Sequence, residues 1–348
     1  MKFGIVGTGM IAEFHARAIG EIPGASVAAC LDTVPERART FAAKHGCRAY
    51  GDLASFLSDP DMEVVNVCSP SGAHLDSAVP AAESGRHVIV EKPLEITVER
   101  CMRIVEACGR AGVVLSGIFP SRFFEAARAV KEALDGGRFG RLTMGSAYVK
   151  WWREQSYYSG SGWKGTKAMD GGGALMNQSI HAIDLLLWYL GKVRRVSAFT
   201  GVAGHTGLEI EDNASATLEF ENGALGAVQG STAVWPGFLK RVEVLGTAGS
   251  AILEEESLAF WRFAAEVPGD EEIRTRFASS TSTGGGASDP TAIGHRGHRL
   301  QIEDILRAIR ENGTPLVDGI EATRPVALIR AIYESAATGR PAVPADPA

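Results

Sequence analysis

Residues 3–12, Phe-Gly-Ile-Val-Gly-Thr-Gly-Met-Ile-Ala, carry the pattern that decides the fold. The apolar run Phe3–Val6 predicts a β-strand, and the glycine-rich turn after it opens a predicted helix. This turn has the GxGxxA spacing of a dinucleotide-binding fingerprint. The first glycine permits the tight turn, the second lets the main chain approach a pyrophosphate, and the helix amino terminus attracts its charge. The residues expected to bind the dinucleotide are Gly7, Thr8, Gly9, Met10 and Ile11.

Asp32, which ends the second predicted strand, bears on the choice of dinucleotide. It lies 20 residues beyond Ala12, where a carboxylate accepts hydrogen bonds from both adenosine ribose hydroxyls and repels a 2′-phosphate. The alternative is an acid at the start of the helix that begins near Pro35. Arg37 could accommodate a 2′-phosphate or stack on adenine. We expect NAD as the cofactor, with NADP less favoured, and Asp32 and Arg37 at its adenosine end.

Strand and helix patterns alternate over residues 2–118, which indicates a parallel sheet covered on both faces. Pro80 interrupts one of the helical stretches and is expected to kink it or delay its start. The fold class is therefore α/β, with a doubly wound Rossmann domain over residues 1–119.

From residue 120 several predicted strands follow one another without helices between them, which indicates an antiparallel sheet. Asn222-Gly223 predicts a type I′ hairpin turn. Residues 279–294 predict a loop by their composition. We expect an α+β domain over residues 120–348 with a large, mainly antiparallel open sheet. Two helices, near 296–311 and 321–337, are expected to close the chain.

The bulk composition excludes several classes of protein. A chain of 348 residues is long enough for two domains, and its net charge of -6 argues against nucleic acid as the main partner. It has neither an 18-residue apolar run nor a signal-peptide pattern, so no membrane span is expected. The five cysteines lack CxxC spacing, which favours reduced thiols in a cytoplasmic protein. No metal site is expected, because no cluster has ligand spacing.

Two clusters carry candidate catalytic groups. Glu91-Lys92-Pro93 follows a predicted parallel strand, and ligands bind at the carboxyl ends of such strands, so Lys92 is expected to face the cofactor. Residues 170–184, DGGGALMNQSIHAID, read as a glycine loop followed by a helix. Asn177, His181 and Asp184 are expected to share one face of this helix. A lone histidine there would more often be a packed polar residue, but its two polar neighbours and the glycine loop ahead of it favour a catalytic site.

The GxGxxA turn, the EKP tripeptide and the GGGAL segment with its N-x-x-x-H-x-x-D continuation resemble the Gfo/Idh/MocA oxidoreductase family. The resemblance extends to His298-x-x-Gln301-x-x-Asp304 and the last helix. It implies that Lys92 hydrogen-bonds the reacting hydroxyl and that His181 is the general acid/base. Asn177, also assigned to the site, departs from the aspartate common in the family. The MNQ sequence resembles the branch that contains nucleotide-sugar dehydrogenases.

The same resemblance implies further binding residues. The cofactor pocket would be lined by Ser69, Pro70, His74 and Glu91 besides Lys92, and Arg122 would lie near the domain junction at the substrate. The aromatic and basic segment 151–167 suits a sugar ring; the alternative is a loop that covers an interface. The substrate residues expected are Arg122, Tyr158, Trp163, Asn177 and His181. Arg153, Lys164 and Lys167 could hold a carboxylate or phosphate.

These residue types suit oxidation of a hydroxyl group, in which carbon loses a hydride and oxygen loses a proton. Histidine can take the proton, lysine can polarise the oxygen, and nicotinamide carries the hydride. We expect an NAD-dependent dehydrogenase or reductase acting on a sugar, cyclitol or sugar derivative. The alternatives are a glycosidase that transiently oxidises its sugar through bound NAD and a non-catalytic NAD-binding regulator. The open sheet face is expected to be buried in a homodimer or homotetramer.

Overall fold

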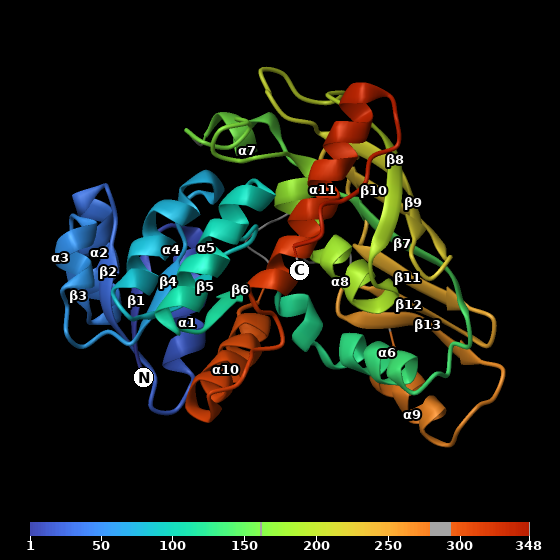
Figure 1. The fold of residues 1–348 in the computed structure, drawn as a ribbon, viewed down its shortest axis with the longest axis horizontal. Helices are drawn as coiled ribbons and strands as arrows, with labels where there is room; N and C mark the ends of the chain where they lie inside the picture. The colour runs from blue at the N-terminus through green and yellow to red at the C-terminus, as the bar shows by residue number, and fades with distance from the viewer. Residues whose placement is uncertain (161, 279–293, 348) are drawn as a thin grey trace.

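Two sheets lie at opposite ends of the molecule, with helices packed between them (Figure 1). The computed structural model describes residues 1–160, 162–278 and 294–347. The loop predicted over 279–294 lies, apart from Gly294, outside the described residues.

The amino-terminal sheet has six parallel strands in the order β3-β2-β1-β4-β5-β6, which confirms the predicted doubly wound sheet. Strands β2 and β3 lie on one side of β1, and β4, β5 and β6 lie on the other. The strand order therefore reverses between β1 and β4, and the carboxyl ends of these two strands form the switch point at which such sheets bind ligands. The strands are β1 (Lys2–Val6), β2 (Ser26–Leu31), β3 (Arg48–Tyr50), β4 (Val64–Val67), β5 (His87–Val90) and β6 (Leu115–Gly117).

Helices cover both faces of this sheet because successive strand residues point to opposite sides. Val64 packs with α1 and α2, whereas Val65 packs with α4 and α5. Pro80 lies inside α4, which nevertheless runs unbroken from His74 to Glu83. The helices are α1 (Met10–Gly20), α2 (Pro35–His45), α3 (Leu53–Leu57), α4 (His74–Glu83) and α5 (Val98–Ala111).

The second sheet has seven strands in the order β13-β12-β11-β7-β10-β9-β8. All neighbours are antiparallel except β7 and β10, which confirms a large, mainly antiparallel sheet. The last strand, β13, was not predicted, and neither was the short β3. The strands are β7 (Leu142–Lys150), β8 (Val193–Gly201), β9 (Asn213–Phe220), β10 (Leu225–Ser231), β11 (Arg241–Gly246), β12 (Gly249–Glu254) and β13 (Ser257–Phe263).

The hairpin between β9 and β10 forms where predicted, but its turn is not type I′. That turn requires positive φ at both Asn222 and Gly223, and only Gly223 has it, at 86°. Gly223 N donates to the Phe220 oxygen at 3.0 Å, which closes a four-residue turn over residues 220–223. Gly223, the last residue of this turn, has the left-handed conformation. This is the type I turn with a glycine bulge.

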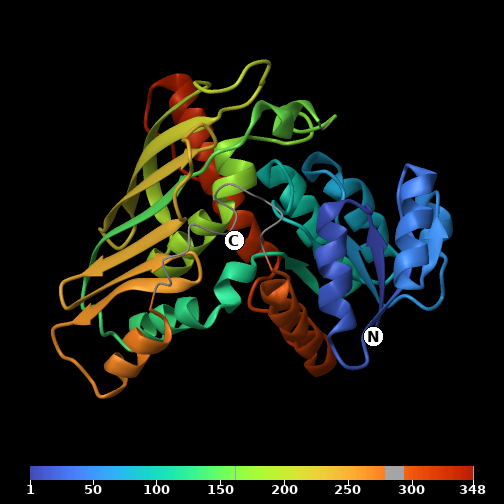
Figure 2. The same ribbon diagram turned by 180° about the vertical axis from the view of Figure 1, so that it is seen from behind.

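Helices occupy one face of the second sheet and leave the other open (Figures 1 and 2). The covered face is packed by α8 and α11, which lie between the sheet and the Rossmann domain. Along β9, Ala216 and Leu218 point to this face and Ser215 and Thr217 to solvent. The remaining helices are α6 (Glu125–Asp135), α7 (Gln155–Ser159), α8 (Ile180–Leu190), α9 (Gly269–Arg276), α10 (Arg296–Glu311) and α11 (Gly319–Thr338).

Helix α10 returns from the second sheet to pack on α1 of the Rossmann domain. Its Gln301 accepts a hydrogen bond from Phe119 N at 2.9 Å and donates one to the Gly117 oxygen at 2.8 Å. The helix thus ties the end of β6 to the last part of the chain.

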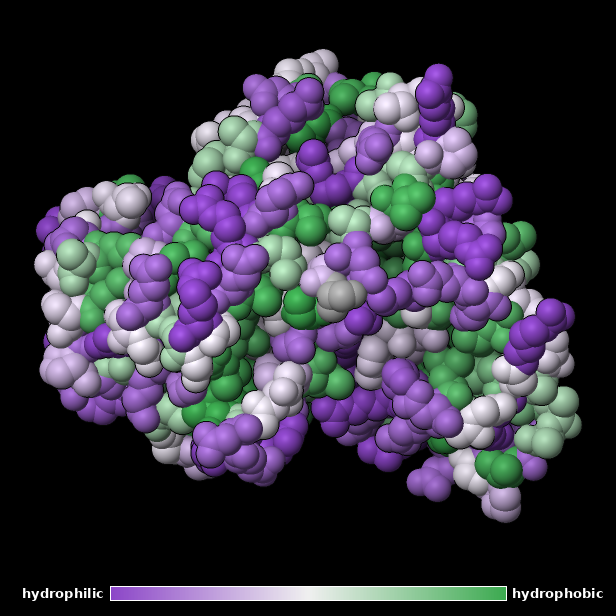
Figure 3. All heavy atoms as spheres, viewed as in Figure 1, coloured by the Kyte–Doolittle hydropathy of each residue, from purple (hydrophilic) through white to green (hydrophobic). Residues whose placement is uncertain are grey.

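Hydrophilic and apolar residues are interspersed over the molecular face drawn in Figure 3. Among the described residues, no helix has both the length and the apolar character that a membrane span requires.

Candidate active site and cofactor site

The loop between β1 and α1 has the geometry that a dinucleotide needs. Gly7 has a φ of 86°, and a Cβ there would lie 2.8 Å from the main chain of Cys68, so only glycine fits. Gly9 precedes α1, and nothing lies within 4 Å of the position of its missing Cβ. Behind them Ala12 is fully buried against the sheet. The helix amino terminus is therefore open to a phosphate, with Met10 exposed beside it.

Asp32 lies beside this loop, where its carboxylate is held by three donors. Thr8 donates from its main-chain nitrogen (2.9 Å) and hydroxyl (2.8 Å), and Val34 N donates at 2.8 Å. Burial alone would raise the pKa of Asp32, but these hydrogen bonds and the Arg37 charge lower it, so the carboxylate is ionised at neutral pH. Thr8, Arg37 and Phe41 line a pocket of about 220 Å³ at this edge. The site therefore fits the adenosine end of NAD.

Ser69, Pro70 and His74 lie just beyond β4, at the switch point of the sheet. The His74 ring is buried between two carbonyl oxygens, with Nε2 2.9 Å from the Ser69 oxygen and Nδ1 2.9 Å from the Pro93 oxygen. His74 thus links the Ser69 loop to the turn after Lys92. Its ring is occupied by main-chain partners, whereas Ser69 and Pro70 are partly exposed.

The glycine loop ahead of α8 is shaped by close packing. A Cβ on Gly172 would lie 2.1 Å from the Tyr333 hydroxyl, and one on Gly173 would lie 1.8 Å from the main-chain oxygen of Glu211. The Glu211 carboxylate accepts from Gly173 N and Leu175 N, each at 2.9 Å, and from the Tyr333 hydroxyl at 2.8 Å. Glu211, which was not predicted, therefore clamps the loop, and Tyr333 on α11 supports it.

Asn177 lies in a π-helical turn, Ala174–Ser179, that leads into α8. Lys92 Nζ donates to its main-chain oxygen at 2.8 Å and to its Oδ1 at 3.3 Å. Asn177 Nδ2 donates to Asp170 at 2.6 Å. Asn177 and His181 were expected to share one face of an α-helix. The π turn instead interrupts the four-residue α-helical spacing between them, and the Asn177 amide is bonded to Lys92 and Asp170.

His181, in the first turn of α8, is partly buried against the edge of Phe119, with ring centroids 5.7 Å apart. Burial lowers the pKa of His181 well below its usual value, and the charges of Lys92 and Lys240 lower it further. Its Nδ1 is buried and has no hydrogen-bond partner among the described residues. The imidazole is therefore neutral at neutral pH and able to accept a proton.

Lys92 is half-buried and follows β5, joined to Pro93 by a cis peptide bond. Burial lowers the pKa of Lys92, and the Glu91 and Asp170 carboxylates oppose this shift. For Asp170 itself, burial raises the pKa despite hydrogen bonds from Gly165 and Asn177. Lys92, Asn177 and Asp170 thus form one hydrogen-bonded chain between the two domains.

A second set of polar groups adjoins Asn177 from the segment after β7. Gln178 Nε2 donates to the Tyr157 hydroxyl at 2.8 Å, and Gln178 Oε1 accepts from buried Arg153 at 2.9 Å. Lys164 Nζ lies 3.6 Å from the centre of the Tyr157 ring. Burial lowers the pKa of Lys164 to about 8. Sequence reasoning missed Asp170, Tyr157 and Gln178, although all three border or lie within the segments it singled out.

Tyr158, Trp163 and Arg122, predicted to bind substrate, make other contacts. The Tyr158 ring is buried and its hydroxyl lies 2.8 Å from Thr232 Oγ1. Trp163 is partly buried, and its main-chain oxygen accepts from the Thr166 hydroxyl. The neighbouring Tyr157 hydroxyl accepts from Gln178, the residue after Asn177, and Lys164 Nζ lies over the Tyr157 ring.

Arg122 is buried at the junction between β6 and the second domain. It forms a two-pronged pair with Asp184 at 2.9 and 2.7 Å and a third contact with Glu321 at 2.8 Å. Asp184, expected on the face of His181, is thus turned to Arg122. Burial raises the pKa of Asp184, and the Arg122 charge opposes that shift. These contacts join the start of the second domain to α8 and α11.

Both regions of the chain match known families. Residues 1–119 match an oxidoreductase family with an NAD-binding Rossmann fold, and residues 127–252 match the GFO/IDH/MocA C-terminal domain. The structure is similar to that of the WlbA dehydrogenase from Bordetella pertussis in complex with NADH and UDP-GlcNAcA. That similarity has a TM-score of 0.90 and 32% identity, and covers 99% of this chain and 97% of that one.

Two curated relatives are similar over much of their length. Inositol 2-dehydrogenase 2 of Saccharopolyspora erythraea is 30% identical over 269 residues, or 76% of each chain. Levoglucosan dehydrogenase of Pseudarthrobacter phenanthrenivorans is 27% identical over 380 residues, covering 97% of this chain and 96% of that one.

A dinucleotide loop with an ionised Asp32, joined to an open-faced sheet domain, defines an NAD-dependent oxidoreductase with two domains. The chain belongs to the Gfo/Idh/MocA family of oxidoreductases.

Proposed function

We propose that this oxidoreductase transfers a hydride between NAD and a hydroxyl- or keto-bearing carbon of a sugar or cyclitol derivative, with His181 as acid/base and Lys92 assisting. The observation that carries the proposal is the position of Lys92. Its Nζ reaches across to the Asn177 oxygen at 2.8 Å, and its charge is close enough to depress the pKa of His181.

The two side chains have complementary protonation states for oxidation of an alcohol. His181 is neutral because burial and nearby cations lower its pKa, so it can take the hydroxyl proton. Lys92, supported by the Glu91 and Asp170 carboxylates, can donate a hydrogen bond to the oxygen as negative charge develops. Bound NAD would supply the hydride chemistry, held by Asp32 and the Gly7–Gly9 loop.

The charges around Asn177 favour a negatively charged substrate. Lys92 donates to Asn177, and Arg153 donates to the adjacent Gln178. Burial raises the pKa of Asp170, and the charges of Lys92 and Lys164 both oppose that rise. The Arg153 guanidinium is buried and donates to the Trp152 oxygen and to Gln178, so it contributes positive charge behind this group. The WlbA dehydrogenase is in complex with UDP-GlcNAcA, and we propose an anionic sugar derivative of this kind as the substrate.

The test is a screen of NAD⁺ reduction at 340 nm over free sugars, inositols, aldonic and uronic acids, and UDP-sugars including UDP-GlcNAcA. Anionic derivatives should give the highest kcat/KM. No NADH with any compound, together with hydrolysis of a nitrophenyl glycoside, would favour the glycosidase alternative. Absence of both reactions in a protein that binds NADH would favour a regulator. A preference for uncharged inositols would refute the anionic substrate.

We further propose that the open sheet face is buried against a second copy of the chain. Side chains on this side include Met144, Phe199 and Leu225, with exposed fractions of 49%, 84% and 52%. A monomer rarely exposes so many apolar groups on one sheet. Light scattering coupled to size exclusion should show a dimer or tetramer, and Phe199→Glu should shift it toward the monomer.

A further inference from the structure

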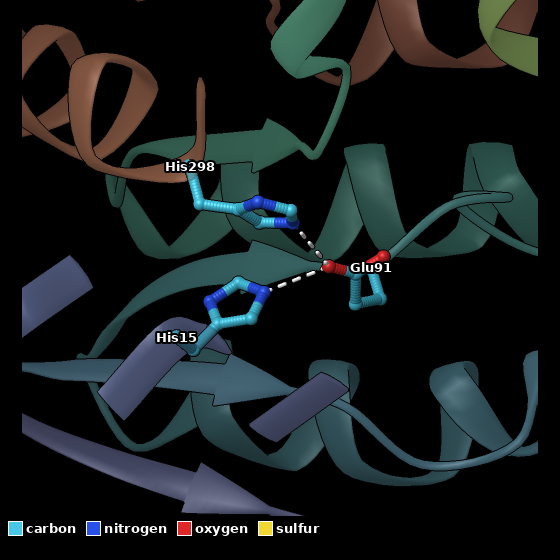
Figure 4. A group of neighbouring side chains, drawn as sticks. All are labelled: His15, Glu91 and His298. Carbon is cyan, nitrogen blue, oxygen red and sulfur yellow. Dashed lines mark hydrogen bonds and ion pairs between the residues drawn. The ribbon is translucent and has the colours of Figure 1, made fainter. Parts of the chain in front are cut away.

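A buried cluster of three side chains includes Glu91, the residue before Lys92, and is separate from the proposed reacting groups. Figure 4 shows its members, His15, Glu91 and His298. His15 comes from α1, Glu91 from the end of β5 and His298 from α10. Glu91 Oε1 lies 2.7 Å from His15 Nε2 and 3.4 Å from His298 Nε2. All three residues are less than a tenth exposed.

A neighbouring amide defines the protonation of His15. Asn66 Nδ2 lies 2.9 Å from His15 Nδ1 and donates to it. His15 Nδ1 is therefore the acceptor, and Nε2 carries the proton that is donated to Glu91. Burial lowers the pKa of His15 although Glu91 opposes this, so the ring is neutral. Burial would raise the pKa of Glu91, but the two histidines lower it well below its usual value. The cluster thus holds an ionised carboxylate.

The same three residue types could in principle bind a metal ion. Two ligands of a tetrahedral zinc ion, each about 2.0–2.1 Å from the metal, stand roughly 3.3 Å apart. The 2.7 Å between His15 Nε2 and Glu91 Oε1 is instead the length of a hydrogen bond. The described geometry is therefore that of a hydrogen-bonded carboxylate.

The cluster acts on the residue next to Glu91 in the chain. Glu91 Oε2 accepts a hydrogen bond from Lys92 N at 3.1 Å, and Glu91 Oε1 contacts the two histidines. Both carboxylate oxygens therefore have partners. We propose that His15 and His298 are positioning residues that hold Glu91 and thereby set the orientation and charge of Lys92. The proposal rests on the proposed function only in taking Lys92 to act at the substrate.

His298 gives the cluster a link to the end of the chain. It lies one turn before Gln301, which is bonded to the main chain of Gly117 and Phe119 at the end of β6. Docking of α10 therefore completes the support of Lys92. The other charged or titratable groups that influence Lys92, or are influenced by it, are Asp170, Arg153, Lys164 and His181.

The first experiment needs no substrate. The pH dependence of Lys92 labelling by a small amine-reactive reagent, read by mass spectrometry, reports its pKa. Glu91→Gln should move the labelling midpoint to lower pH by about one pH unit, because a neighbouring negative charge is lost. His295→Gln is the matched control. His295 precedes α10, the helix that carries His298, and its Nε2 lies 2.6 Å from Glu21 rather than near Glu91. An unmoved midpoint in Glu91→Gln would overturn the proposal.

The second experiment separates positioning from packing. His298→Leu and His15→Leu should lower kcat by about 10- to 100-fold while KM for NAD⁺ stays within threefold, and His298→Gln, which keeps a donor, should recover most of the loss. Equal rates for the Leu and Gln variants would refute positioning. If the Leu variants fail to fold, Glu91→Gln labelling still decides.

Two further results complete the test. One equivalent of Zn²⁺ bound by the protein and lost in His298→Gln would show a metal site and overturn the hydrogen-bonded clamp. A shifted midpoint in Glu91→Gln together with normal turnover in Lys92→Ala would support the clamp and refute the role of Lys92 in the proposed function, so the two failures are distinguishable.

Discussion

The ammonium group of Lys92, at the end of a Rossmann strand, lies 2.8 Å from the main-chain oxygen of Asn177, in the π-helical turn that leads into α8 of the other domain. Lys92 thus joins the two domains through Asn177, beside the side chains proposed to act on the substrate. Any tilt of one domain relative to the other would alter this contact.

Removal of either proposed catalytic side chain should abolish most turnover. His181→Ala and Lys92→Ala are each expected to lower kcat by about 10²–10⁴-fold, the usual contribution of a general acid or base. NADH binding, followed by fluorescence, should persist because Asp32 and the Gly7 loop are untouched. A variant with near-normal turnover would exclude that residue from the mechanism.

Asn177→Asp should affect Lys92 more than His181, because the amide contacts Lys92 and Asp170. The new carboxylate at residue 177 would lie close to that of Asp170, so at low pH the two would hold one proton between them. As pH rises this proton is lost and the pair gains a negative charge. That charge raises the pKa of Lys92, so the basic limb of the kcat/KM profile for oxidation should move to higher pH. A larger displacement of the acidic limb, assigned to His181, would contradict the observed pairing.

Lys164 should make binding of an anionic substrate dependent on pH. Its pKa of about 8 means that it is charged below that value and neutral above it. KM for the anionic substrate is therefore expected to rise as pH passes 8, while Lys164→Gln should show a KM raised about tenfold or more at pH 7 and no further rise. Lys192→Gln, an exposed lysine paired with Asp346, is the control. A pH-independent KM in the parent protein would argue against this role.

Asp32→Ala should weaken the preference for NAD⁺ over NADP⁺. The ionised carboxylate, held by Thr8 and Val34, repels a 2′-phosphate and binds the ribose hydroxyls. We expect the ratio of kcat/KM for the two cofactors to fall by about tenfold or more, equivalent to ~1.4 kcal/mol. Glu106→Ala, which removes an exposed carboxylate on α5 of the same domain, should leave the ratio unchanged. If the parent enzyme uses NADP⁺ equally well, Asp32 is not the selector.

Asp184→Asn should destabilise the fold, because it leaves the buried Arg122 guanidinium without its main counter-charge. Loss of one partner of a buried ion pair typically costs about 3–5 kcal/mol of unfolding free energy. The exposed pair of Asp135 with Lys131 offers the control, since Asp135→Asn should cost less than about 1 kcal/mol. Urea denaturation measures both. Equal stabilities of the two variants would show that the Arg122 pair is not structural.

The order of strands and helices and the cofactor loop were predictable from sequence, because both depend on local patterns. Alternating apolar runs specify strand and helix, and the Gly7 turn needs a conformation that glycine adopts readily. The short strand β3 escaped because three residues carry no periodicity. The turn at Asn222 was mistaken because Asn-Gly is compatible with more than one turn type, and hydrogen bonding within the hairpin selects among them.

The contacts of the candidate site were decided only by tertiary structure. Lys92, Asn177 and His181 could be selected from the sequence, but the bonding of Asn177 to Lys92 and Asp170 could not, since a π turn and an α turn look alike in sequence. His15, Glu91 and His298 are separated by up to 283 positions, and their meeting depends on the docking of α10 on α1. The residue types of the site and their local spacing can be read from the sequence. Hydrogen bonds between side chains distant in sequence form only when the elements that carry them pack together, because that packing sets the distances between the side chains.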